Sequence, residues 1–279
     1  AKGDKAKVGT LIAEAGGFVS APIYSSVSGT VFKVDTSIDA TGYRKPCIII
    51  NVEGDEWEES IDRSDKLETL EAHAELTSEE IVNRIKVAGM GGAGFPTFIK
   101  LCPPPGAKAE CVIINGVECE PYITADYRLM MEHADEILVG LNLLMKAAKV
   151  EKGYIGIEDN KPAAIKLFEE KTAGDSRIEI VPLAKKYPQG GEKQLVDAVI
   201  RRQVPAPPAI PVNVGAIVQN VGTAFAVYQA VMKNKPLFER YTTVTGKQVK
   251  NPGNFLVRMG TPFSQMIENC GGLPEGDNK

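Results

Sequence analysis

Paired cysteines and long apolar runs are both missing from this sequence. Its five cysteines are scattered, odd in number and without a C-x-x-C pair: Cys47, Cys102, Cys111, Cys119 and Cys270. This spacing argues against a disulfide framework, a structural zinc site and an iron–sulfur cluster within these residues, so we expect buried free thiols in a reducing cytoplasm. No apolar run reaches the roughly 18 residues that span a bilayer and no signal peptide opens the chain, so we expect any membrane association to be peripheral.

A basic excess is missing too. The chain has 32 Lys and Arg against 36 Asp and Glu, a net charge of -4, which gives no support for a nucleic-acid partner. The hydrophobic share of 43% and the charged share of 24% are those of an ordinary globular protein. A length of 279 residues suits about two domains. The chain opens AKGDKAKVG without an initiator Met, and we treat it as a fragment of a larger protein.

Residues 1–75 have the pattern of short β-strands followed by an acidic connector. The segments GTLIAEA, SAPIYSSVSGTVFKV and KPCIIINV combine apolar runs with frequent Gly, Pro and Ser, which is typical of small, tightly turned strands. This pattern resembles the barrel-sandwich fold of biotin- and lipoyl-carrier domains, in which a lysine on an exposed hairpin holds the swinging arm. Gly16, Gly17 and Phe18 stand at the corresponding positions, so we expect a structural unit that carries no arm.

Residues 76–235 change to strands that alternate with helices of about 10–20 residues, which indicates a Rossmann-like α/β domain around a largely parallel sheet. Thr77 and Glu80 have the spacing of a capping box, so we expect a helix from residue 78 that runs straight into a glycine cluster. The expected strands are ECVIING, GYIGIED, RIEIVPL and VGAIVQN. The longest expected helix runs from about Asp126 to Ala148.

Residues 236–279 change character again. Two short strands joined by a polar turn precede a short helix that starts at Thr261-Pro262, a good N-terminal signal. We interpret this segment as a small β-grasp unit, not necessarily complete here.

The segment VAGMGGAGFPTFIK, residues 87–100, has four glycines in six positions. Glycine is costly inside a regular element, so the backbone here is expected to form a tight turn, pack against another backbone or approach a phosphate. A Gly-rich loop that opens a helix offers free amides to an anion, and Lys100 on the next turn can meet the same phosphate. The strand that precedes a dinucleotide-binding Rossmann loop is missing, which indicates a different phosphate-binding device.

The whole string G-x-G-G-A-G-F-P-T-x-x-K is more specific than its glycines. It resembles the flavin loop of the NADH-oxidising flavoprotein subunit of respiratory complex I, and INGVECEP, YPQGGEKQL and VQNVGT are similar to further segments of that subunit. CEPYITADYRLM, NPGNFLVRMGTP and the carrier-like unit extend the resemblance, over nearly the whole chain, to the C subunits of Rnf complexes. Those complexes are membrane-bound ferredoxin:NAD oxidoreductases coupled to ion translocation.

The resemblance implies a role for thirteen residues. The residues implied to hold FMN are Gly89, Gly91, Gly92, Lys100, Asn115, Glu118, Tyr187, Gly190, Asn220 and Thr223. The residues implied to contact NADH are Phe95, Glu120 and Glu192.

Plainer interpretations of some of these residues remain open. Phe95 also fits a core aromatic that plugs the loop, and Lys100 also fits a solvated surface charge. Asn115 and Asn220 also fit residues that only close turns, since Asn tolerates turn conformations readily.

Departures from the complex I pattern bear on the nucleotide contacts. Val117, Gly191 and Gly222 stand where that flavoprotein has acidic residues, and LCPPPG after the lysine lacks its aromatic pair. Glu118 and Glu120 lie close together, which is the pattern of a solvated rim unless they accept hydrogen bonds from ribose hydroxyls, flavin N–H or a carboxamide.

The resemblance also implies cofactors, partners and location. FMN is the expected resident cofactor, NAD(H) the substrate, and 4Fe-4S clusters are expected in a domain outside this stretch. The expected partners are the other Rnf proteins of the complex, membrane-embedded and iron–sulfur-containing, with ferredoxin indirectly, at the cytoplasmic face of the bacterial cell membrane. We assign no catalytic residue, because hydride exchange between NAD(H) and FMN is cofactor chemistry.

Two other functions remain open. One is a flavin-dependent cobalamin reductase of related architecture, and the other is a non-catalytic ligand-binding scaffold. His73 and His133 lie outside every motif, and we assign no metal ligands.

Overall fold

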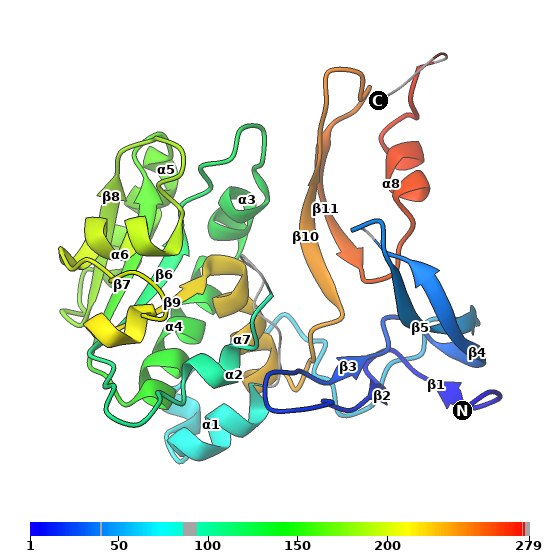
Figure 1. Ribbon diagram of the computed structural model, residues 1–279, viewed down its shortest axis with the longest axis horizontal. Coiled ribbons are helices and arrows are strands. Elements are labelled where there is room, and N and C mark those ends of the chain that lie inside the picture. The colour runs from blue at the N-terminus through cyan, green and yellow to red at the C-terminus, as the bar shows by residue number, and fades with distance from the viewer. Residues whose placement is uncertain (40, 86–93, 275, 277–279) are drawn as a thin grey trace.

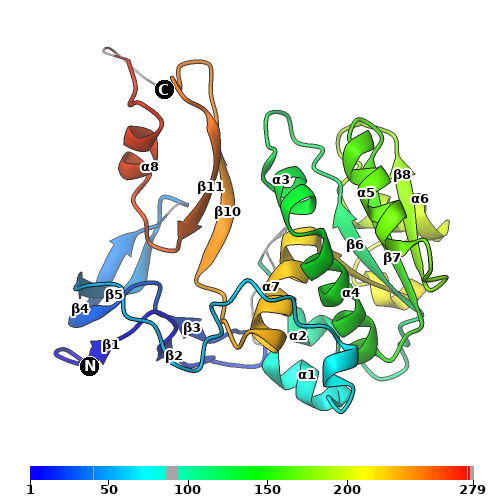
Figure 2. The same cartoon turned by 180° about the vertical axis from the view of Figure 1, so that it is seen from behind.

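The computed structural model describes residues 1–39, 41–85, 94–274 and 276, and the chain folds into three units (Figure 1). An α/β unit lies on one side, and an N-terminal β unit with a C-terminal hairpin and helix lies on the other. Figure 2 shows the same arrangement from behind. Where the chain is described, no helix is both long and apolar enough to cross a membrane.

The N-terminal unit consists of two small antiparallel sheets. The first has the order β1-β4-β5 and the second pairs β2 with β3: β1 (Lys5–Ala6), β2 (Leu11–Ala13), β3 (Ile23–Tyr24), β4 (Gly29–Ile38) and β5 (Arg44–Val52). The connection between β2 and β3 holds Gly16, Gly17 and the 76% exposed Phe18. The exposed hairpin of a carrier domain is therefore present, without a lysine at those positions.

The α/β unit is built on four parallel strands in the order β8-β7-β6-β9. Its strands are β6 (Cys111–Gly116), β7 (Lys152–Glu158), β8 (Ile178–Leu183) and β9 (Ala216–Asn220). Its helices are α1 (Ser78–Arg84), α2 (Thr97–Lys100), α3 (Ala125–Glu132), α4 (Ala134–Ala148), α5 (Pro162–Thr172), α6 (Glu192–Ile200) and α7 (Val221–Met232). Short 3-10 turns span Glu71–His73 and Pro211–Val214. The predicted parallel α/β fold is confirmed.

The core of this unit is divided by the sheet. One face packs against α1, α3, α4, α5 and α7 through fully buried residues such as Ile114, Leu141 and Phe168. The other face packs against α6 through Ile113 and Leu195. Because both faces are covered, the strands are rich in apolar residues, as parallel strands usually are, most clearly in β6 with its run of Val112, Ile113 and Ile114.

The predicted long helix is wrong in one respect. His133 takes a non-helical conformation (φ -131°, ψ 36°) and divides the segment into α3 and α4. Its two ring nitrogens lie 3.0 Å from Glu136 Oε1 and 2.9 Å from Tyr241 Oη. The break is thus stabilised by a contact with the C-terminal unit, which helical periodicity cannot predict.

The predicted capping box is confirmed at α1. The Glu80 amide donates to Thr77 Oγ1, and the Thr77 amide donates to Glu80 Oε2. The expectation that this helix runs into the glycine cluster is wrong, because Ile85 is already non-helical (φ -78°, ψ 65°).

The C-terminal unit is an antiparallel hairpin followed by one helix. Its elements are β10 (Glu239–Val244), β11 (Gly253–Arg258) and α8 (Phe263–Asn269). Pro262 precedes the helix, as predicted. Residues of α3 pack against both strands of the hairpin, which places this unit beside the α/β unit.

The cysteines agree only in part with the expectation of buried thiols. All five are free, but only Cys111 and Cys270 are buried. Cys102 is exposed because it lies on the turn after α2 rather than in the core.

Candidate functional site

The carboxyl ends of β6 and β9 form a topological switch point of the sheet. From β6 the chain moves to β7 and β8 on one side, and it returns to β9 on the other side. Asn115 and Asn220 are direct partners in the parallel register and stand at these carboxyl ends. In open α/β sheets, ligands bind at this kind of edge.

Asn115 connects the end of β6 to the loop before α6. Its Oδ1 accepts from the Val117 amide at 3.1 Å, and its Nδ2 donates to Gly190 O at 2.9 Å. It therefore closes a turn, as the plainer interpretation predicted, and it also holds a second loop. Gly190 packs so tightly that an added Cβ would lie 2.7 Å from Val117 O and 3.3 Å from Cys119 Sγ. At this position the chain can present only backbone.

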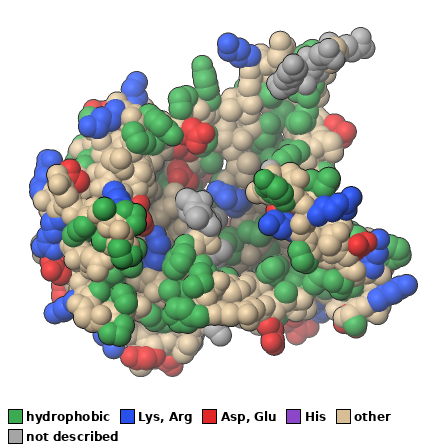
Figure 3. Space-filling view, in the orientation of Figure 1, with side chains coloured by type: hydrophobic (Ala, Val, Ile, Leu, Met, Phe, Trp, Pro, Cys, Tyr) green, Lys and Arg blue, Asp and Glu red, His purple; other side chains and the backbone are tan. Residues whose placement is uncertain are grey.

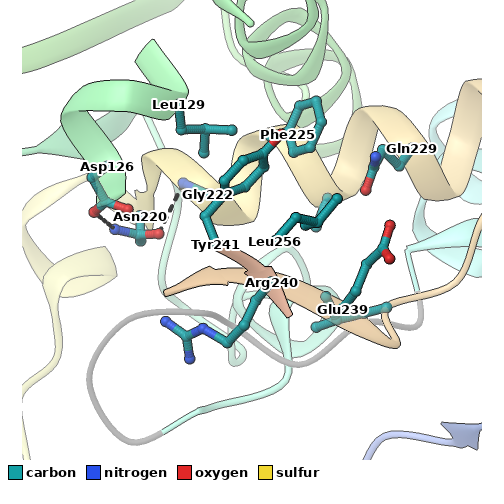
Figure 4. A pocket seen from close by; sticks show the side chains of 12 residues that line it. Asp126, Leu129, Asn220, Gly222, Phe225, Gln229, Glu239, Arg240, Tyr241 and Leu256 are labelled. Carbon is teal, nitrogen blue, oxygen red and sulfur yellow. Dashed lines mark hydrogen bonds between the residues drawn. The ribbon is translucent and has the colours of Figure 1, made fainter. Parts of the chain in front are cut away.

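Asn220 is the N-cap of α7. Its Oδ1 accepts from the Gly222 amide at 2.9 Å, and its Nδ2 donates to Asp126 Oδ2 at 2.7 Å. Thr223 is buried in the first turn of the same helix. Figure 4 shows Asn220 between Asp126 and this helix start, beside a small pocket that Arg240 also lines. Burial raises the pKa of the Asp126 carboxyl.

The Glu118 side chain is only 5% exposed, so the plainer interpretation as a solvated rim is wrong for it. Its carboxylate accepts from the amides of Asp126 at 3.0 Å and Tyr127 at 3.3 Å, at the start of α3. Desolvation by burial is the main reason that the pKa of Glu118 rises to about 7. Glu120, two residues on, is exposed and matches the rim interpretation.

Glu158 and Lys161 belong to the same edge, although no motif in the sequence pointed to them. Glu158 ends β7, and Lys161 precedes α5. Lys161 Nζ lies 3.5 Å from Glu158 Oε2 and 3.8 Å from Glu118 Oε2. The position of a Glu at the carboxyl end of an apolar strand was the signal that could have found this pair.

Lys100 is partly exposed, at 30% of its side chain, but its ammonium has two partners in the fold. Its Nζ donates to Glu192 Oε1 at 2.8 Å and to Val218 O, on β9, at 3.0 Å. The structure thus joins a residue assigned to FMN to one assigned to NADH. Glu192 is the first residue of α6 and Val218 lies in β9, so the Lys100 ammonium connects these two elements.

The two aromatic residues of the predicted site are both accessible. Phe95 is 39% exposed, so the interpretation as a core aromatic is wrong. Tyr187 is 75% exposed and precedes a cis-proline in the loop that carries Gly190. Both rings are available for contact with a ligand. Gly89, Gly91 and Gly92 lie outside the described residues.

The face that holds this edge is hollowed between the α/β unit and the C-terminal hairpin, and acidic side chains gather beside the hollow (Figure 3). Among the residues that the structure describes, no group of three or more His, Cys, Asp or Glu side chains could hold a metal ion. The arrangement offers amides, carboxamides, carboxylates and two lysines, Lys100 and Lys161, which suits an organic ligand with a phosphate.

Three families match the chain in succession. Residues 1–55 match the RnfC barrel sandwich hybrid domain, residues 82–229 the Nuo51 FMN-binding domain, and residues 241–279 the SLBB domain. The order agrees with the predicted barrel-sandwich unit, α/β flavin-type domain and β-grasp unit.

Curated relatives match nearly the whole chain. It is 43% identical to the C subunit of the Na(+)-translocating ferredoxin:NAD(+) oxidoreductase complex of Acetobacterium woodii, over 100% of this chain and 62% of the relative. It is 44% identical to the C subunit of the proton-translocating ferredoxin:NAD(+) oxidoreductase complex of Clostridium ljungdahlii, over 98% of this chain and 59% of the relative. The chain spans about three fifths of the length of these relatives.

Among solved structures, an NAD+-reducing NiFe-hydrogenase in the H2-reduced state has a TM-score of 0.60. The match covers 74% of this chain and 42% of that chain at 22% identity, and it supports the fold alone. The curated relatives confirm the resemblance to C subunits of Rnf complexes, and the chain belongs to the Nuo51 FMN-binding domain family.

Proposed function

We propose that this chain is the flavin-binding and NAD(H)-interacting part of the C subunit of an Rnf-type ferredoxin:NAD oxidoreductase. The observation that carries the proposal is the meeting of Asn115, Asn220 and the Lys100–Glu192 pair at the switch point of the sheet. The names of the relatives and the family matches supply the reaction class.

The residues at this edge fit FMN. The start of α7, with its Asn220 cap and buried Thr223, suits the phosphate, because amides and the helix dipole favour an anion there. Asn115 and Glu118 are placed to hydrogen-bond the flavin or its ribityl chain. Gly190 fits a cradle in which a Cβ would collide with neighbouring backbone. We extend the FMN assignment to Tyr187, Lys100 and the three glycines of the loop.

We assign NADH contact to three residues on the accessible side. Phe95 is exposed enough for its ring to stack on a nicotinamide, and Glu120 is exposed enough to accept from sugar hydroxyls. Glu192 shares the Lys100 ammonium, so its role in nucleotide contact is coupled to flavin binding.

Bound FMN would supply two-electron exchange with NAD(H) and single-electron exchange with iron–sulfur clusters. The protein's part is to hold the two rings in reacting geometry and to set the polarity around them. We assign residues 1–75 to the carrier-like unit and its connector, residues 76–235 to the flavin domain and residues 236–279 to the β-grasp unit.

Partners and location are part of the same proposal. We place the 4Fe-4S clusters outside this stretch, and the chain at the cytoplasmic face of the cell membrane, held there by other Rnf proteins. Ferredoxin exchanges electrons with it indirectly.

The test is titration of this chain with FMN, FAD and NAD+, followed by anaerobic addition of NADH. We expect FMN fluorescence to be quenched on binding, with FAD and NAD+ weaker as resident ligands. NADH should then bleach the flavin absorbance. A folded sample that leaves FMN fluorescence unchanged at saturating protein contradicts the proposal.

A further inference from the structure

A buried cluster of charges lies under the carboxyl ends of β6 and β7. Lys161 contacts two carboxylates, with Nζ 3.5 Å from Glu158 Oε2 and 3.8 Å from Glu118 Oε2. The exposed fractions of the three side chains are 10% for Lys161, 1% for Glu158 and 5% for Glu118. The Tyr127 ring lies 5.5 Å from the same ammonium and helps to cover it. One cation therefore serves two carboxylates that water hardly reaches.

The cluster contains an unmet acceptor. Within the described residues, Glu158 Oε1 is buried and has no hydrogen-bond partner. An unpartnered carboxylate oxygen in such a place is costly, because its hydration is lost and nothing replaces it. The described residues therefore supply one ammonium for two carboxylates and leave one carboxylate oxygen without a donor.

Glu118 is the member of the cluster that we assign to the flavin site. Asp126 raises its pKa in addition to burial, whereas Lys161 and the hydrogen bonds from the amides of Asp126 and Tyr127 lower it. The hydrogen bond from Asn220 and the positive charge of Arg240 favour the ionised form of Asp126. Lys161 is a cation that Glu118 shares with a second buried carboxylate, Glu158.

We propose that Lys161 and Glu158 are positioning residues that set the charge of Glu118. We further propose that Glu118 takes up a proton when negative charge arrives at the neighbouring ligand site. This second step rests on the proposed flavin function. The balance is simple: the Glu118 carboxylate and one solvent proton give the neutral carboxyl, and no electron passes through these residues.

The direction of each dependence follows from electrostatics. Removing the Lys161 charge takes away the cation that stabilises the Glu118 carboxylate, so Glu118 should stay protonated to a higher pH. When the Glu158 charge is removed, the Lys161 ammonium is no longer shared with that carboxylate and stabilises the Glu118 carboxylate more strongly. Glu118 should then lose its proton at a lower pH. A merely structural role does not produce opposite shifts.

The test is an infrared pH titration of the carboxyl C=O band in this chain without added ligand. Glu118→Gln identifies the band. We expect Lys161→Met to move its midpoint upward and Glu158→Gln to move it downward, each by about one pH unit or more. Lys166→Met is the matched control, because Lys166 lies on the helix that Lys161 precedes but is 77% exposed, and it should leave the midpoint in place. Shifts of the same sign, or none, overturn the proposal.

Two additions keep the test decisive. If Lys161→Met does not fold, Lys161→Arg keeps the charge and should keep the midpoint near that of the wild type, while Glu158→Gln still carries the opposite sign. The second addition is the FMN dissociation constant across the same pH series, which should change at the same midpoint in each variant.

The two readouts separate this proposal from the proposed function. If FMN does not bind, the proposed function fails, and the infrared shifts still decide whether Lys161 and Glu158 set the charge of Glu118. If FMN binds with a dissociation constant that ignores the Glu118 midpoint, the link to the ligand site is overturned.

Discussion

Lys100 and Glu192 are 92 residues apart in the sequence, yet the Lys100 ammonium donates to the Glu192 carboxylate across 2.8 Å. The same ammonium donates to Val218 O on the last strand of the sheet. The pair therefore fixes the start of α6 against the carboxyl edge of β9, and it couples a residue assigned to flavin to one assigned to nicotinamide nucleotide.

Two substitutions at this pair should change FMN affinity in opposite directions. Lys100→Ala should weaken FMN binding about tenfold, because it removes a charge-assisted contact to an anionic ligand. Glu192→Gln should strengthen it, because the Lys100 charge is then no longer shared. FMN fluorescence titration measures both. If both substitutions weaken FMN equally, the pair acts only as a structural link between α6 and β9.

Gly190 should tolerate no side chain. In Gly190→Ala the new Cβ meets Val117 O at 2.7 Å, so the loop must move and its bond from Asn115 Nδ2 should break. We expect a loss of about 1–3 kcal/mol in the free energy of unfolding together with loss of FMN binding.

The control for Gly190 is Gly174→Ala, because a Cβ at Gly174 has nothing within 4 Å. Its effect on the free energy of unfolding should stay within about 0.5 kcal/mol. Urea unfolding and FMN titration decide between the two positions. Equal stability of both variants would mean that the close approach at Gly190 is absent in solution.

The order of the strands, and the residues that end a strand or start a helix, were predictable from the sequence. Asn115 and Asn220 each follow an apolar run, so their place at the carboxyl edge of a parallel sheet followed from the α/β pattern. Thr77 and Glu80 defined the start of α1 because a capping box depends only on local spacing. Local chemistry and strand order were enough for these features.

Features that depend on distant contacts were not predictable. The break at His133 is supported by Tyr241, 108 residues away, while the helical periodicity runs through it unchanged. The burial of Glu118 and its partner Lys161 arises only when α3 and α5 pack on the same edge of the sheet. Glu118 stands two positions before the exposed Glu120, and nothing in this spacing indicates that the Glu118 carboxylate is buried.

Asn220→Asp should destabilise the protein at neutral pH and much less in acid. Aspartate is as good an N-cap as asparagine, but its carboxylate would face Asp126 Oδ2, which now accepts a bond from Asn220 at 2.7 Å. Two carboxylates so close cannot both ionise cheaply, and protonation of one relieves the repulsion. We expect a cost of about 1–3 kcal/mol at neutral pH.

The control for this substitution is Asn220→Ser, which keeps the cap without adding a charge. Its cost in the free energy of unfolding should change little between neutral and acidic pH, whereas the cost of Asn220→Asp should shrink. Thermal unfolding of both variants at several pH values measures the difference. Parallel pH curves would count against the contact with Asp126.

Phe95→Ala should slow flavin reduction by NADH and leave FMN bound. The Phe95 ring is 39% exposed, so its removal costs little core packing, and a lost stacking contact with nicotinamide is worth about 0.5–1.5 kcal/mol. Phe95→Tyr keeps the ring and should react at nearly the normal rate. Stopped-flow bleaching and FMN titration of both variants check this, and loss of FMN in Phe95→Ala would reverse our placement of the ring.

The free energy of unfolding should fall as pH rises from about 4.5 to about 7, because over this window Glu118 keeps its proton longer in the folded state than in the unfolded state. Its pKa is raised in the folded state from the ordinary value of 4.5 to about 7, so in this window the folded state binds more protons than the unfolded state. Stability then falls with increasing pH and levels off above the folded pKa. At about 1.4 kcal/mol for each unit, the full loss is about 3 kcal/mol.

Glu118→Gln cannot ionise, so its stability relative to the wild type should improve steadily across the window. Urea unfolding of both proteins in the same buffers gives that difference, in which the other titrating groups cancel. A difference that stays constant with pH would mean that Glu118 remains ionised in the fold.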